Sequence, residues 1–176
     1  MVTRMETNSL LDQAYQAFQA GDSVRALAAL KKAGELGDIS AALDFAYFSA
    51  SDNDEAVMSY LQSFGVQNQI IQYHTALIDR FYYSRQFTDD IICTLVHLAN
   101  NNHAESILVL LSWCTNDVWA RGSLESLLLT NKPNIYRQLV GDEEKKVSRS
   151  DNPISSERII DVIRKREDEL KRLKEN

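Results

Sequence analysis

The side chains best suited to chemistry in this sequence are three histidines and two cysteines. Cys93 and His97 stand four residues apart on one expected helix, a spacing that lets both reach a single metal ion. His74 and Cys114 would complete a tetrahedral set of ligands. Cys93, however, lies in an apolar segment where a small buried thiol is common, and no second ligand pair lies close in the sequence. We therefore interpret these residues as structural and expect no metal and no cofactor.

A second pattern is His103-Ala104-Glu105, the His-x-acid spacing that supplies two of the three iron ligands in facial-triad oxygenases. No histidine follows it, so the third ligand is missing, and the segment is expected to be a loop that enters a helix. The sequence also has no Gly-x-Ser-x-Gly motif, and its six glycines form no phosphate-binding loop. We predict that the chain is not an enzyme.

The helices that would position such side chains are predicted most clearly in residues 22–49. Small and apolar side chains recur there every three or four residues, which predicts two amphipathic helices. The two stripes contain Ala26, Leu27, Leu30, Ala33 and Leu36, and then Ala41, Ala42, Phe45, Ala46 and Ser49. Gly37 is expected to end the first helix in the left-handed conformation, and Asp38 is expected to cap the second.

The same pattern, a glycine that ends one helix followed by an aspartate that caps the next, recurs along the first third of the chain. Gly21-Asp22 precedes Gly37-Asp38 by sixteen residues, and a polar cluster at residues 51–54 follows about one such step later. The first helix is predicted to start at Ser9, and the fourth is predicted to end at Gly65. Four helices in two antiparallel pairs account for this pattern.

These residues also resemble a known family. Seven of them are similar to the junction of two Sel1-like repeats, relatives of the tetratricopeptide repeat that are built from antiparallel helix pairs: Ala26, Leu30, Ala33, Gly37, Ala41, Phe45 and Ala46. The resemblance covers residues 10–65 and implies a right-handed stack of helix pairs that recognises other proteins. In such a stack the first helix of each pair lines the groove. It follows from the resemblance that Asp12, Gln16, Asp44 and Tyr47 would face a partner.

Beyond Gly65 the helical periodicity continues without the repeat pattern. Residues 68–86 are predicted to form one helix with a broad apolar stripe, made of Ile70, Ile71, His74, Leu77, Ile78 and Phe81. Tyr73, Arg80 and Tyr83 fall on a second face, and tyrosine and arginine often anchor protein interfaces. The alternative is that Tyr73 and Tyr83 simply pack against the following helices.

Further helices are expected to begin after Thr88, after Asp117 and at Pro133, the second of these being interrupted near Gly122. Residues 104–114 are apolar nearly all round, so we predict an enclosed helix, with a buried strand as the alternative. The whole pattern predicts an all-α fold of about nine to ten helices, arranged as a stack of antiparallel helix pairs.

Three regions are predicted: a helical-repeat domain (residues 1–140), a charged linker (residues 141–153) and a charged amphipathic C-terminal helix (residues 154–176). Ser155 or Ser156 would cap the last helix. Its Ile159, Ile163, Leu170 and Leu173 have the spacing of a coiled-coil seam, with Arg166 in the middle position. Two heptads with an arginine in the seam are too few for a stable coiled coil. The helix is therefore expected either to pack on the domain or to await a partner.

The charge distribution limits the classes of partner. The net charge is −6; residues 1–140 carry nine Lys or Arg against fifteen Asp or Glu, whereas residues 141–176 carry ten of each. Such a body repels phosphate groups, so we expect no nucleic acid as a partner. No apolar run has the length of a signal peptide or a membrane span, and two isolated cysteines favour a reducing compartment. We expect a cytoplasmic protein without a membrane partner.

The sequence therefore favours a non-enzymatic scaffold or adaptor that binds another protein or a peptide in an acidic groove. The candidate binding residues are Asp12, Gln16, Asp44, Tyr47, Tyr73, Arg80 and Tyr83. One alternative is an accessory or regulatory module of an enzyme, such as an iron- and 2-oxoglutarate-dependent oxygenase whose catalytic part is absent from this sequence. The other is a self-assembling structural protein that forms a homodimer through the C-terminal helix.

Overall fold

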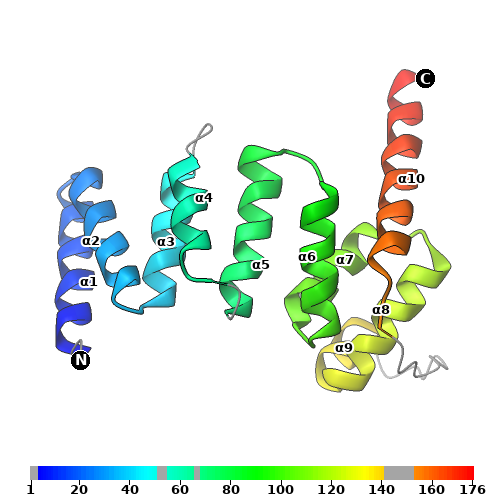
Figure 1. Ribbon diagram of the computed structural model, residues 1–176, viewed down its shortest axis with the longest axis horizontal. Helices are drawn as coiled ribbons and strands as arrows, with labels where there is room; N and C mark the ends of the chain where they lie inside the picture. The colour runs from blue at the N-terminus through cyan, green and yellow to red at the C-terminus, as the bar shows by residue number, and fades with distance from the viewer. Residues whose placement is uncertain (1–3, 51–54, 66–67, 141–152) are drawn as a thin grey trace. The chain divides into compact units, whose positions relative to one another are not determined.

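A computed structural model describes residues 4–50, 55–65, 68–140 and 153–176 (Figure 1). These residues form ten α-helices and one π-helical turn, and no strand occurs among them, which confirms the all-α prediction. The chain divides into two compact units, residues 1–85 and residues 86–176. The predicted cap at residues 51–54 and nearly all of the predicted linker lie outside the described residues.

Unit 1 contains α1 (Arg4–Gln19), α2 (Ser23–Glu35), α3 (Ile39–Ser49), α4 (Glu55–Gln62), α5 (Gln69–Ile78) and the π-helical turn η1 (Asp79–Tyr83). The predicted start of the first helix at Ser9 is wrong, because α1 already begins at Arg4. Ser9 does not cap the helix. It lies inside α1, where its hydroxyl accepts a hydrogen bond from the Gln13 side chain at 3.4 Å.

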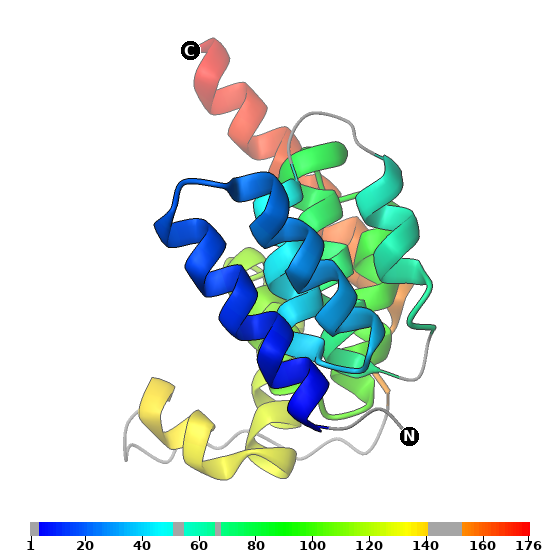
Figure 2. The ribbon, with the colours of Figure 1, turned by 90° about the vertical axis from the view of Figure 1, so that its left-hand side faces the viewer.

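The predicted Gly-Asp punctuation is confirmed at both junctions. Gly21 and Gly37 have φ angles of 76° and 107°, in the region that favours glycine. Asp22 and Asp38 then cap α2 and α3, since each carboxylate accepts a main-chain N–H of the first turn, at 3.1 and 2.9 Å. As a result α1 packs against α2, and α2 against α3, in antiparallel order (Figure 2).

Small residues determine how closely the helices of unit 1 approach. One core cluster contains Ala14, Ala29, Leu30, Ala33 and Ala41. A second contains Ala42, Ala46, Ala50, Val57, Tyr60, Leu61, Ile71 and Ile78. Gly34 of α2 faces Ala42 so closely that a Cβ atom at Gly34 would lie 2.8 Å from the Ala42 Cβ and would clash with the Tyr60 hydroxyl. Since α3 contributes to both clusters, it joins the first helix pair to the elements that follow.

The predicted apolar stripe of residues 68–86 is only partly correct. Ile71 and Ile78 are buried, but Ile70 is 50% exposed and Phe81 is 61% exposed. Ile70 lies in the first turn of α5, before any change of register. For Phe81 the reason is the π-helical turn, in which the Ser84 N–H donates to the Asp79 carbonyl five residues earlier, at 2.8 Å. This wider turn rotates the following side chains away from the α-helical register. Tyr83, rather than Phe81, therefore packs against the core cluster that contains Ile78.

Unit 2 contains α6 (Asp89–Asn100), α7 (Ala104–Trp113), α8 (Val118–Asn131), α9 (Pro133–Val140) and α10 (Ser156–Glu175). Three predicted caps are confirmed: the side chains of Thr88, Asp117 and Ser155 accept main-chain N–H groups at 3.3, 2.8 and 3.4 Å. The apolar run at residues 104–114 is a helix, which excludes the alternative of a buried strand. Pro133 begins α9, as predicted.

Two local expectations in unit 2 are wrong. α8 runs through Gly122 without interruption, because buried Ala120 and Leu124 on either side hold the helix against its neighbours and outweigh the roughly 1 kcal/mol that a glycine costs in a helix. Cys93 is exposed rather than buried. It shares the outer face of α6 with Asp89 and His97, opposite the buried Ile92 and Leu95.

The C-terminal helix packs on unit 2 along its first half. Ile159 and Ile163 of α10 are fully buried, and α10 contacts α6. Leu170 and Leu173, in the last two turns, are 40% and 73% exposed. The apolar seam predicted from the sequence is therefore buried in the first half of α10 and exposed to solvent in its last two turns. None of the described helices combines the length and the apolar character needed to span a membrane.

Candidate functional site

An exposed aromatic pair joins α1 to α3. The ring centres of Phe18 and Phe48 lie 5.4 Å apart, with the ring planes tilted by 47°. Phe18 is 39% exposed, Phe48 is 64% exposed, and Tyr15, one turn before Phe18, is 64% exposed. Aromatic side chains that remain this accessible in a folded unit are typical of surfaces that bind another molecule.

A second aromatic contact joins α3 to α5. The Tyr47 hydroxyl and the His74 Nδ1 form a hydrogen bond of 2.6 Å, and their rings meet edge to face with centres 5.5 Å apart. The Tyr73 ring lies 5.0 Å from the His74 ring on the same helix. Burial raises the pKa of Tyr47 above its usual value of 10.0, and the neighbouring Tyr73 and Tyr82 hydroxyls raise it further. The Tyr47 phenol therefore stays protonated near neutral pH.

Together these contacts define a first-helix face, which we use as the name for the surface formed by Tyr15, Phe18, Tyr47, Phe48, Tyr73 and His74. Its members come from α1, α3 and α5. Because α2 and α4 alternate with these helices along the chain, the face connects the first helices of successive pairs. This is the arrangement that a stack of helix pairs requires.

The predicted binding residues fall into two groups. Asp12, Gln16 and Asp44 are exposed on α1 and α3, and Tyr47 and Tyr73 belong to the first-helix face. Arg80 and Tyr83 lie in the π-helical turn that follows α5. The π-helical turn places the Arg80 guanidinium 5.4 Å from the centre of the Phe81 ring and packs Tyr83 against the core cluster. The sequence prediction missed this because it assumed a continuous α-helix.

The aromatic pair itself was not among the predicted binding residues. Phe18 lies in the last turn of α1 and is 39% exposed. A usable signal was nonetheless present, because Phe18 and Phe48 are separated by thirty residues. At the same offset Arg25-Ala26-Leu27 is followed by Glu55-Ala56-Val57, so a spacing of thirty residues is a feature of the sequence itself.

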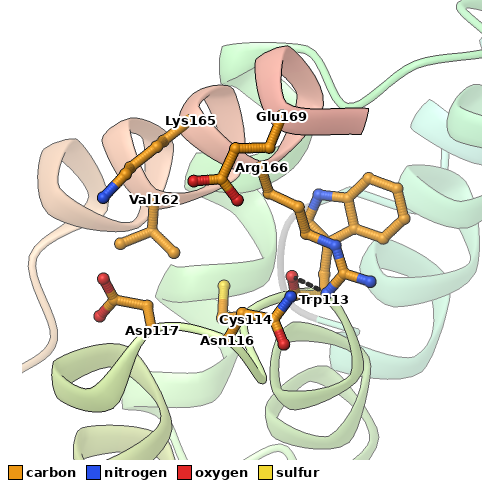
Figure 3. A pocket seen from close by; sticks show the side chains of 8 residues that line it. All are labelled: Trp113, Cys114, Asn116, Asp117, Val162, Lys165, Arg166 and Glu169. Carbon is orange, nitrogen blue, oxygen red and sulfur yellow. Dashed lines mark hydrogen bonds between the residues drawn. The ribbon is translucent and has the colours of Figure 1, made fainter. Parts of the chain in front are cut away.

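Unit 2 contains a small pocket of about 50 Å³ between α10 and the α7–α8 junction (Figure 3). It is lined by Trp113, Cys114, Asn116, Asp117, Val162, Lys165, Arg166 and Glu169. Burial and the nearby Asp117 carboxylate raise the pKa of Cys114 from 9.0 to about 11, although Arg166 acts in the opposite direction. The thiol is therefore protonated near neutral pH, and it is a poor nucleophile and metal ligand.

The His103-Ala104-Glu105 pattern has a structural explanation. His103 caps α7: its Nδ1 lies 3.3 Å from the Ser106 main-chain nitrogen and 2.8 Å from the Ser106 hydroxyl. Its Nε2 lies 3.5 Å from the Glu105 carboxylate, which completes a local helix-start arrangement. In the part of the chain that the structure describes, no group of three or more His, Cys, Asp or Glu side chains is placed to hold a metal ion.

We compared the chain with protein families, with curated proteins and with solved structures, and found no relative. No family model matches the chain. No curated protein and no solved structure shows significant similarity to it either. The resemblance to Sel1-like repeats therefore stays a prediction.

Proposed function

We propose that the chain is a non-enzymatic helical scaffold that binds another protein or a peptide on the first-helix face. The observation that carries this proposal is the exposed Phe18–Phe48 pair; the residue before Phe48 on α3, Tyr47, contacts His74 of α5. Exposed aromatic rings bury large areas when a partner covers them, and aromatic side chains are frequent hot spots of protein interfaces. The exposed thiol of Cys93 supports a reducing compartment such as the cytoplasm.

The test is a comparison of two single substitutions at exposed positions. Phe48→Ala removes a ring from the first-helix face, whereas Val24→Ala shortens a side chain on α2 that is 79% exposed. Each protein is immobilised and incubated with lysate of the native cell, and bound proteins are quantified by mass spectrometry. A partner retained by the parent and Val24→Ala but lost by Phe48→Ala supports the proposal. Equal retention by all three proteins contradicts it.

Tyr47→Ala is a less informative variant than Phe48→Ala. Tyr47 is half-buried and hydrogen-bonded to His74, so its removal changes the contact between α3 and α5 as well as the surface. Phe48 contacts Phe18 of α1, but its side chain is 64% exposed and lies at the surface, so its removal should disturb the packing of the helices less. Circular dichroism of Phe48→Ala should match that of the parent.

A second candidate function is self-association through the end of α10. It is favoured by Leu170 and Leu173, two apolar side chains on successive turns that remain exposed. The double substitution Leu170→Glu and Leu173→Glu leaves the buried Ile159 and Ile163 in place, so it tests association without undocking the helix. A fall in the mass measured by light scattering supports self-association, and an unchanged mass excludes it.

A further inference from the structure

We propose that the Phe18–Phe48 pair binds a cationic side chain, so that the partner of the first-helix face presents a basic segment rich in Arg or Lys. This inference rests on the proposed function and specifies the chemistry of the partner. It follows from the exposed rings, from the charges around them and from a comparable contact within the same chain.

The rings have the geometry of an open aromatic corner. Their centres are 5.4 Å apart and their planes are tilted by 47°, so a group placed over one ring is flanked by the other. The negative faces of aromatic rings attract an ammonium or guanidinium group within about 6 Å of the ring centre. Among the described residues, no Lys or Arg is recorded over either ring, and both rings are accessible.

The helices around the pair add negative potential. Phe18 and Phe48 lie in the last turns of α1 and α3, which run in the same direction because the intervening α2 is antiparallel to both (Figure 2). A helix C-terminus carries a partial negative charge, and α3 has no basic residue in its last turn; at the end of α1 the N-terminus of α2 follows directly and offsets part of this charge. Asp44, one turn before Phe48 on the same side of α3, adds an exposed carboxylate.

Unit 1 already contains a lysine bound in this manner. The Lys31 ammonium lies 5.9 Å from the centre of the Phe45 ring and 5.8 Å from the centre of the Tyr60 ring. These two rings are themselves paired edge to face, with centres 4.9 Å apart. The Phe18–Phe48 pair presents similar ring spacing at the surface, where a cation from a partner can reach it.

The experiment measures binding of a defined probe to the full chain. The probe is a fluorescein-labelled decapeptide that alternates Gly and Arg, and its neutral match carries citrulline in place of each Arg. Citrulline keeps the shape and most of the hydrogen-bonding groups of arginine but removes the charge. In fluorescence anisotropy titrations, the Arg peptide is expected to bind about 10-fold more tightly than the citrulline peptide.

Two further variants separate this inference from the proposed function. Phe48→Leu keeps an apolar side chain but removes the aromatic face, so it should weaken binding of the Arg peptide by about 5- to 10-fold. Asp44→Asn should weaken it as well, whereas Val24→Ala should leave it unchanged. The inference is overturned if the two peptides bind equally, if neither binds, or if Phe48→Leu binds the Arg peptide as the parent does. In each of those cases, loss of a cellular partner in Phe48→Ala would still uphold the proposed function.

Discussion

The Arg166 guanidinium donates a hydrogen bond to the main-chain carbonyl of Trp113 at 2.6 Å, and thereby connects α10 to the end of α7. The same guanidinium lies 5.1 Å from the centre of the Trp113 ring. Carbonyl groups in the last turn of a helix have no partner within the helix and carry partial negative charge, so an arginine is favourable there. The residue that would weaken a coiled-coil seam instead fixes α10 on its own unit.

Replacing Arg166 by Ala should therefore destabilise unit 2. The variant loses a charge-assisted hydrogen bond to a helix end, which lowers the free energy of unfolding by about 1–3 kcal/mol. Lys171→Ala, at an exposed position of the same helix, should change it by less than about 0.5 kcal/mol. Both tryptophans lie in unit 2, so urea unfolding followed by tryptophan fluorescence reports on this unit. Equal midpoints for the two variants would show that Arg166 does not hold α10 in place.

The π-helical turn predicts an unusual order of mutational effects on α5 and η1. Phe81→Ala should change stability by less than about 0.5 kcal/mol, because the ring is 61% exposed. Tyr83→Ala should cost about 1–2 kcal/mol, because Tyr83 packs against the core cluster. The measurement is urea unfolding followed by far-ultraviolet circular dichroism. A continuous α-helix would place Phe81 on the apolar stripe and reverse this order.

Two glycines in helices should respond to alanine in opposite directions. At Gly34 an added Cβ would lie 2.9 Å from the Ala42 Cα, so Gly34→Ala should force α2 and α3 apart and cost about 1–3 kcal/mol. At Gly122, apart from the adjoining residues and the nearby backbone of α8 itself, nothing lies within 4 Å of the added Cβ, so Gly122→Ala should stabilise α8 by about 0.5–1 kcal/mol. Thermal unfolding of both variants tests this. Stabilisation by both substitutions would contradict the close contact of α2 with α3.

Tyr60 should make unit 1 sensitive to alkaline pH. Burial, and to a smaller extent Glu35, raise the pKa of Tyr60 from 10.0 to about 12, and its hydroxyl donates to the Lys31 carbonyl at 3.1 Å. Because the pKa is higher in the folded state, the contribution to stability is complete below pH 10 and is lost as the pH rises through 12. The loss should be on the order of 2 kcal/mol.

The control for this pH dependence is Tyr60→Phe. It should be less stable at neutral pH by about 1 kcal/mol, since it lacks the hydrogen bond. Its free energy of unfolding should fall less steeply than that of the parent between about pH 10 and pH 12. Some slope should remain, because the pKa of Tyr47 is raised as well. Identical slopes for parent and variant would exclude Tyr60 as the titrating group.

The sequence alone determined the helices and most of their ends. Gly37 followed by Asp38 ends one helix and caps the next through contacts within a few residues, and the same holds for the caps at Thr88, Asp117 and Ser155. Such signals are local, so they can be recognised without knowing which helices meet.

Only the tertiary structure decided which side chains form surfaces and which form the core. Periodicity could not place the π-helical turn, because its register depends on packing of Tyr83 against residues of other helices. Likewise, nothing near Arg166 in the sequence indicates that its partner is the Trp113 carbonyl, more than fifty residues away. Contacts between distant segments depend on the packing of whole helices, and local patterns do not encode that packing.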